Sequence, residues 1–189
     1  MRVKPRLNEF LKKLKRGPAV VLPKDFGMIV AYAGVNKDSI VVDIGGGSGF
    51  LALSLARIAK RVVTYERREE FAEIIRKNVE KTGMENVEIK VKDAGEGIEE
   101  KEVDVITMDT PEAALLLDNA YSSLKKGGYA VAYLPNIEQA KEFYLKAEKM
   151  FEEVFMLESM IREYEVREKG TRPKHFGLLH TAYLVFCRK

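Results

Sequence analysis

The chain has 189 residues, of which 46% are apolar, so it is long enough for one domain with a full hydrophobic core. Its longest apolar runs have the length of strands, and none approaches the ~18 residues of a membrane-spanning helix. Cys187 is the only cysteine, and His175 and His180 are the only histidines. We therefore expect a cytoplasmic protein with no disulfide, no metal site and no membrane partner.

The N-terminal part is basic. Residues 1–17 contain seven Lys or Arg residues and one acid, Glu9, whereas the net charge of the whole chain is only +3. This segment predicts either a phosphate-facing patch or the solvated face of a helix. We expect helices over 7–16 and over 23–34, the second starting at Pro23 and ending at Gly34. Residues 1–34 then form a helical extension to a domain over 35–189.

From residue 39, strand and helix patterns alternate. Apolar runs predict strands over 39–44, 61–66, 87–93 and 128–135 and within 99–109; amphipathic segments predict helices over 48–59, 68–83, 111–128 and 136–151. Two further strand-like runs, 154–167 and 180–189, are separated only by a predicted loop over 168–179. The fold class predicted is α/β, with a doubly wound, mostly parallel seven-stranded Rossmann-like sheet that ends in an antiparallel hairpin.

A glycine-rich loop follows the first predicted strand. The stretch DIGGGSG supplies six candidate ligand-binding residues, Asp43, Gly45, Gly46, Gly47, Ser48 and Gly49. Glycines here let a ligand approach the backbone, and the next helix begins with unpaired N–H groups. The G-x-G-x-G spacing differs from the G-x-G-x-x-G of dinucleotide-binding loops. A tight turn without a ligand is the alternative.

Carboxylates end the second and third predicted strands. Glu66 is placed to accept hydrogen bonds from ribose hydroxyls, and Asp93 from an adenine amino group; Arg67 and Ala94 follow them. Each acid alone is equally compatible with an exposed strand end or a helix cap. Together with the loop they line the carboxyl edge of the sheet, where open α/β sheets bind ligands. The pattern favours an adenosine ligand without pyrophosphate, and S-adenosylmethionine fits best.

Asp109 ends the fourth predicted strand, in the stretch VITMDTPEAALLL. It either caps the helix that follows, since Asp-x-Pro is good capping chemistry, or faces a substrate. This part of the chain, with VLPKD (21–25), AYLPN (132–136) and the tail HTAYLVF (180–186), resembles the tRNA (adenine-N1)-methyltransferase family of class I S-adenosylmethionine-dependent methyltransferases.

That resemblance implies roles at a methyl-acceptor site. Asp109 would line the cofactor site and also hold the adenine, while Tyr133 would pack on or hydrogen-bond the base. His180 would lie near the same pocket, with Thr181 beside it and Arg172 in the preceding loop. The alternatives are an aromatic core residue for Tyr133 and a structural role for His180.

The chain also departs from the family pattern. Only about 16 residues precede the matching region, where the family carries a small β-rich domain; Leu22 stands where a polar aromatic or His is usual; and DTPEAA lacks a second proline. Three functions follow: methylation of tRNA at adenine N1, methylation of a small molecule as in compact corrinoid-pathway enzymes, or a non-catalytic tRNA-binding subunit. We expect a homo-oligomer, and the Lys- and Glu-rich composition suits a thermophile.

Overall fold

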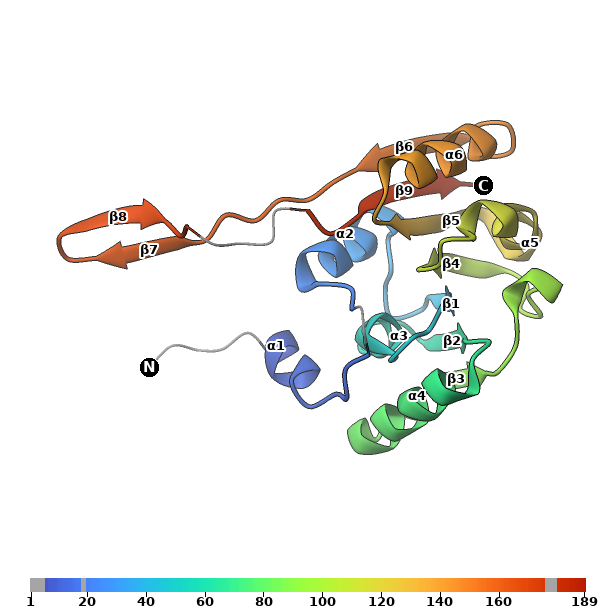
Figure 1. Cartoon of the computed structure of the whole chain (residues 1–189). Coiled ribbons are helices and arrows are strands. Elements are labelled where there is room, and N and C mark those ends of the chain that lie inside the picture. The colour runs from blue at the N-terminus through green and yellow to red at the C-terminus, as the bar shows by residue number, and fades with distance from the viewer. Residues whose placement is uncertain (1–5, 18–19, 176–179) are drawn as a thin grey trace.

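The computed structural model describes residues 6–17, 20–175 and 180–189, and it contains one large and one small sheet. The strands of the large sheet lie in the order β3-β2-β1-β4-β5-β9-β6, and β9 runs opposite to the other strands of this sheet (Figure 1). The strands are β1 (Ile40–Ile44), β2 (Arg61–Tyr65), β3 (Val87–Lys90), β4 (Val103–Met108), β5 (Leu124–Leu134), β6 (Glu153–Leu157), β7 (Tyr164–Arg167), β8 (Gly170–Pro173) and β9 (Tyr183–Arg188). The predicted fold class is confirmed.

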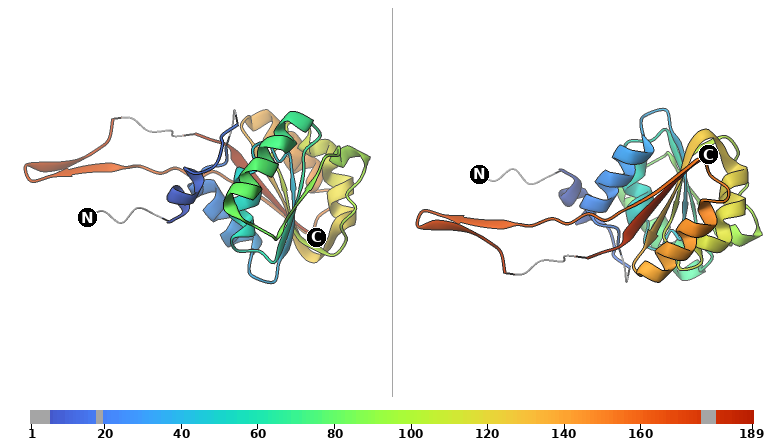
Figure 2. Two further views of the ribbon diagram at one scale, coloured as in Figure 1. Left: turned by 90° about the horizontal axis from the view of Figure 1, so that it is seen from below. Right: turned by 90° about the horizontal axis from the view of Figure 1, so that it is seen from above.

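Helices cover both faces of the large sheet (Figure 2). They are α1 (Arg6–Leu11), α2 (Pro23–Ala33), α3 (Phe50–Ala56), α4 (Glu69–Thr82), α5 (Leu117–Ser123) and α6 (Ile137–Ala147), with 3₁₀ turns η1 (Ala94–Glu96) and η2 (Ala113–Leu116). Alternate residues of β1 point to opposite cores: Val41 packs with α2 and α3, and Val42 packs with α5 and α6. Because both faces are buried, most side chains of the central strands are apolar. No helix within the described residues is long and apolar enough to cross a membrane.

The predicted helix over 7–16 is wrong in its second half. Helix α1 ends at Leu11, and the chain then turns. The Lys15 N–H donates to the Asn78 Oδ1 at 2.7 Å, and the Asn78 amide donates back to the Lys15 carbonyl at 2.9 Å. Leu14 is buried against Phe50. These contacts with α3 and α4 replace helical hydrogen bonds, so tertiary packing overrides local propensity. The division of the chain at residue 34 stays a prediction.

The predicted helix over 111–128 is also shorter than expected. It consists of the η2 turn and α5, and residues from Leu124 onward belong to β5. Gly128 lies so close to β4 that a Cβ atom there would be 2.9 Å from the Val103 carbonyl oxygen. Gly128, one of the two glycines that suggested a helix end, therefore allows two strands to approach.

The C-terminal strands pair as predicted, but the segment between them does not form a loop. Strands β6 and β9 are antiparallel, with Phe155 opposite Phe186. The predicted strand over 154–167 divides into β6 and β7, and β7 pairs with β8 in a separate ribbon, here called the arm (164–173). In both views of Figure 2 the arm projects away from the body. Part of the predicted loop, 176–179, lies outside the described residues.

Candidate active site

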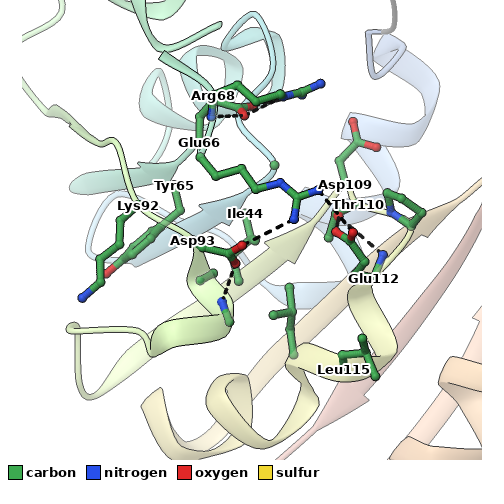
Figure 3. A pocket seen from close by; sticks show the side chains of 16 residues that line it. Ile44, Tyr65, Glu66, Arg68, Lys92, Asp93, Asp109, Thr110, Glu112 and Leu115 are labelled. Atoms are coloured by element: carbon green, nitrogen blue, oxygen red, sulfur yellow. Dashed lines mark hydrogen bonds and ion pairs between the residues drawn. The ribbon is translucent and has the colours of Figure 1, made fainter. Parts of the chain in front are cut away.

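A cavity of about 500 Å³ lies at the carboxyl ends of the central strands (Figure 3). This volume suits a drug-sized ligand. The residues lining it come from the strand ends and from the segments that follow them: Ile44, Gly45, Tyr65, Glu66, Arg67, Arg68, Lys92, Asp93, Ala94, Gly95, Asp109, Thr110, Pro111, Glu112, Leu115 and Leu116. Six of the residues expected at a ligand site therefore line one cavity: Gly45, Glu66, Arg67, Asp93, Ala94 and Asp109.

Two glycines of the loop after β1 serve different purposes. Gly45 has φ 82°, and a Cβ atom there would collide with the Asp109 backbone carbonyl. Its small size therefore lets β1 approach the end of β4. Gly47 has φ 54°, and the nearest atom to a Cβ placed there is the Gly45 carbonyl oxygen, 3.8 Å away. The backbone at Gly47 is thus open to close approach by a ligand.

Glu66 is held ionised at the end of β2. Its residue is 3% exposed, and its carboxylate accepts from the Gly47 N–H at 2.8 Å and the Arg68 N–H at 3.0 Å. Burial opposes ionisation, but hydrogen bonds from Arg68 and Gly47 outweigh it and lower the pKa of Glu66 below its ordinary value. Glu66 also connects the glycine loop to the end of β2. The sequence predicted a ribose-binding acid, an exposed strand end or a helix cap, but not this connection.

Asp93 and Arg67 form one rim of the cavity. The Asp93 Oδ1 accepts from the Gly95 N–H at 2.8 Å and so caps η1, as one alternative expected. Its Oδ2 lies 3.4 Å from the Arg67 Nη1, and the Arg67 Nη2 lies 3.2 Å from the Glu112 Oε1. The guanidinium therefore bridges two walls of the cavity, as Figure 3 shows. Asp93 keeps 43% of its side chain exposed, which leaves it accessible to a ligand.

Asp109 lies on the opposite wall and does not act as a helix cap. The η2 turn begins at Ala113 with Glu112 in the capping position. Within the described part of the chain, no hydrogen bond reaches the Asp109 carboxylate. Burial and the nearby negative charge of Asp43 raise the pKa of Asp109 to about 7. An acid in this setting is stabilised when a cation or a hydrogen-bond donor binds beside it.

The buried carboxylate of Asp43 lies close to Asp109, behind this wall of the cavity. It is 1% exposed and accepts from the Thr107 hydroxyl at 2.7 Å and the Thr64 hydroxyl at 3.0 Å. Burial raises the pKa of Asp43 to about 6, against the effect of these two hydrogen bonds. With Asp109, it makes this side of the cavity favourable for positive charge.

Tyr133 and His180 do not line the cavity. Strands β4 and β5 pair as far as Met108 and Ala132, so Asp109 and Tyr133 follow as neighbours at the sheet edge. The Tyr133 hydroxyl lies 3.5 Å from the Asp25 Oδ2. His180 is farther out: its Nδ1 is 2.6 Å from the Glu158 Oε1, and its Nε2 is 2.8 Å from the Pro135 carbonyl oxygen. The Glu158 hydrogen bond raises the pKa of His180, and these contacts match the structural alternative.

Several cavity residues were missed from the sequence. The Arg68 Nε pairs with the Glu66 Oε1 at 3.0 Å, and Glu112 pairs with Arg67. Nothing in the sequence spacing of Arg68 or Glu112 marks them. Ser48 was expected, and its hydroxyl oxygen is buried without a hydrogen-bond partner in the described structure. That oxygen lies toward Gly17, and Ser48 does not line the cavity. The open backbone at Gly47 and the carboxylates at both ends of the cavity suit a polar, cationic adenosine ligand. No cluster of three potential metal-binding side chains occurs among the described residues.

The fold and the cavity define the class of protein. Sheet order, a glycine loop after β1, an acid at the end of β2 and an acid after β3 together make this chain a class I S-adenosylmethionine-dependent methyltransferase. A family described as "tRNA methyltransferase complex GCD14 subunit" matches residues 10–182. The chain belongs to this family.

Individual relatives agree with this assignment. The tRNA (adenine(57)-N(1)/adenine(58)-N(1))-methyltransferase TrmI of Methanocaldococcus jannaschii is 36% identical, over 98% of this chain and 77% of the relative. The crystal structure of a SAM-dependent O-methyltransferase from Thermotoga maritima superposes with a TM-score of 0.92 at 34% identity, covering 98% of this chain and 71% of that one. For the crystal structure of tRNA (m1A58) methyltransferase TrmI from Aquifex aeolicus the TM-score is 0.91 at 29% identity, covering 98% of this chain and 76% of that one.

Proposed function

We propose that this methyltransferase transfers a methyl group to N1 of an adenine in tRNA. The observation that carries the proposal is Asp109, a partly buried carboxylate at the end of β4 that lines the cavity and receives no hydrogen bond within the described structure. Such a group is available to an acceptor base. The TrmI relatives, whose names specify adenine N1, support the choice of acceptor.

The residues of the cavity divide into two groups in this proposal. Glu66 accepts from the ribose hydroxyls of S-adenosylmethionine and Asp93 from its adenine amino group, and Arg67 and Ala94 form the rim beside them. The glycine loop, residues 43–49, and Asp109 hold the other end of the cofactor. An ionised Glu66, an exposed Asp93 and the open backbone at Gly47 support these assignments.

The chemistry asked of the protein is modest. The bound cofactor supplies an electrophilic methyl group on a positively charged sulfur. Adenine N1 is already a lone-pair nucleophile, so no strong base has to act first. Asp109 accepts from the exocyclic amine, orients the ring, and stabilises the positive charge that develops on the base. Tyr133, at the end of the neighbouring strand β5, packs on the base or hydrogen-bonds to it. In tRNA the base has to leave its stack to reach this edge.

A basic surface suits the phosphates of tRNA. Four exposed basic residues lie in the segment after α1, namely Lys12, Lys13, Lys15 and Arg16. The two hydrogen bonds between Asn78 and Lys15 fix this segment on α4, beside the glycine loop, since Asn78 also donates to the Ser48 carbonyl at 2.8 Å. We further propose a homo-oligomer in the cytoplasm. The four exposed apolar residues of the arm and its base, Met160, Ile161, Tyr164 and Val166, support self-association.

The test is methyl transfer from radiolabelled S-adenosylmethionine to unmodified tRNA, followed by mapping of the modified base. Product at adenine N1 supports the proposal, and Asp109→Ala should remove it even at a saturating concentration of cofactor. Methylation confined to small-molecule pools would favour the corrinoid-type alternative. Salt-dependent tRNA binding without transfer would favour the non-catalytic subunit, because phosphate contacts release counterions.

A further inference from the structure

A buried ion pair lies in the first turn of α2, outside the cavity. The Lys24 Nζ is 2.7 Å from the Asp25 Oδ1, and the two side chains are 6% and 0% exposed. Both residues belong to the stretch VLPKD (21–25). The family resemblance of this stretch gives neither Lys24 nor Asp25 a function. Removing two charges from water is unfavourable unless their remaining hydrogen-bonding capacity is satisfied.

The ion pair is fully satisfied by the two chain segments at the base of the arm. The Ser159 hydroxyl donates to the Asp25 Oδ1 at 2.8 Å, and the Thr181 hydroxyl donates to the Asp25 Oδ2 at 2.8 Å. The Lys24 ammonium donates to the Ser159 carbonyl at 2.8 Å and to the Thr181 hydroxyl at 2.6 Å. Ser159 follows β6, and Thr181 precedes β9. The pair therefore joins the outgoing and returning segments of the arm to α2.

The same ion pair reaches the acceptor side of the cavity through Tyr133. The Tyr133 hydroxyl donates to the Asp25 Oδ2 at 3.5 Å. Tyr133 is the neighbour of Asp109 at the sheet edge, because β4 and β5 pair up to the preceding residues. One buried carboxylate thus contacts an aromatic side chain beside Asp109 and both segments at the base of the arm.

This arrangement is a costly way to fill space. Apolar residues of similar volume commonly replace a buried ion pair without loss of stability, so stability alone does not account for it. The ion pair contributes geometric specificity instead, because charged hydrogen bonds fix angles and distances that apolar packing leaves free.

We propose that Lys24 and Asp25 are positioning residues for methyl transfer. They hold Tyr133 in place beside Asp109, and they fix the base of the arm to α2. The side chains that contact the acceptor base are then held in fixed positions. The proposal rests on the function proposed above, because it concerns the acceptor side of that site. The chain supplies a matched control in Lys37 and Asp38, another adjacent Lys–Asp pair, whose side chains are 88% and 78% exposed.

The experiment compares Lys24→Met/Asp25→Leu with Lys37→Met/Asp38→Leu. We expect kcat for tRNA methylation to fall about 10- to 100-fold in the first variant, as for small misplacements of reacting groups, with cofactor affinity within twofold of wild type. The control should keep wild-type values. If the first variant does not fold, Thr181→Val replaces it and should lower kcat, while Thr181→Ser, which keeps the hydroxyl, restores it.

Combination with Tyr133→Phe separates positioning from general loss of structure. If Lys24 and Asp25 act through Tyr133, the combined variant loses little more kcat than the worse of its parents. Losses that multiply, or an unchanged kcat in the first variant, would overturn the proposal.

Amide hydrogen exchange gives a readout that needs no tRNA. Exchange at residues 158–163 and 180–184 should rise at least tenfold in the first variant and stay constant in the control. Constant exchange in both would also overturn the proposal. A wild-type protein that does not methylate tRNA would reject the proposed function instead, and the exchange data would still decide whether the ion pair holds these segments.

Discussion

Replacing Asp109 with Asn should stabilise the protein and inactivate it. The pKa of Asp109 rises from 3.8 to about 7 because the carboxyl is buried and faces Asp43. At 1.36 kcal/mol per unit, this shift corresponds to about 4 kcal/mol. Since Asp43 and Asp109 titrate as a coupled pair, we expect a gain of about 2–4 kcal/mol from removing one charge. For a domain of this size that is about 5–15 °C in Tm.

The sign of this effect depends on pH. The folded-state pKa of Asp109 lies above the unfolded value, so the unfolded chain releases its proton first as pH rises. Wild-type stability therefore falls between about pH 4 and pH 7 relative to the Asn variant, and the difference is constant above pH 7. Below pH 4 both forms are neutral at this position, and the two stabilities should converge.

The assay is thermal unfolding followed by circular dichroism from pH 4 to pH 8.5, with Asp38→Asn as the control because that carboxylate is 78% exposed. In parallel, methyl transfer by Asp109→Asn should fall by about two orders of magnitude or more, the usual scale for losing an electrostatic contact in a transition state. A pH-independent change in Tm, or a loss of stability at pH 8, would refute the reasoning that the ionised Asp109 carboxylate destabilises the folded protein. Unchanged transfer would refute its role in the reaction.

Three further results are expected. Binding of cationic S-adenosylmethionine, measured calorimetrically, should strengthen as pH rises through about 7 and Asp109 ionises, whereas binding of neutral S-adenosylhomocysteine should change less; parallel curves would contradict this. Glu66→Gln should weaken cofactor binding about tenfold or more through loss of a charged acceptor, and equal affinity would remove Glu66 from the site. Replacing Lys15 and Arg16 with Gln should weaken tRNA binding and reduce its dependence on log salt concentration by up to about two units in slope; an unchanged slope would move the RNA surface elsewhere.

Local patterns in the sequence predict most of the fold. Strand and helix periods, together with the glycine loop, are sufficient for the parallel part of the sheet, because each unit is a contiguous piece of chain. Errors occur where distant segments meet. Helix α1 stops early because Lys15 bonds to Asn78, and β5 starts early because Gly128 packs on β4. Neither partner is near in sequence.

The candidate site shows the same division. Asp93, Glu66 and Asp109 were predictable because each follows a strand directly or within three residues, and parallel strands bring their carboxyl ends to one edge. The bridge from Arg67 to Glu112 was not, since it depends on how two loops face each other. Asp25 is another example. The charged stretch PKD looks like the exposed start of a helix, yet its carboxylate is completely buried.

The position of β9 has a consequence for the way the protein is made. This strand lies between β5 and β6, and Tyr133 pairs with Leu184 across a long stretch of sequence. During synthesis, β5 and β6 therefore emerge from the ribosome before the strand that joins them, with their facing edges open. Such edges recruit other chains. We expect nascent chains to depend on chaperones until residues 183–188 emerge, and the sheet to close rapidly once they have emerged.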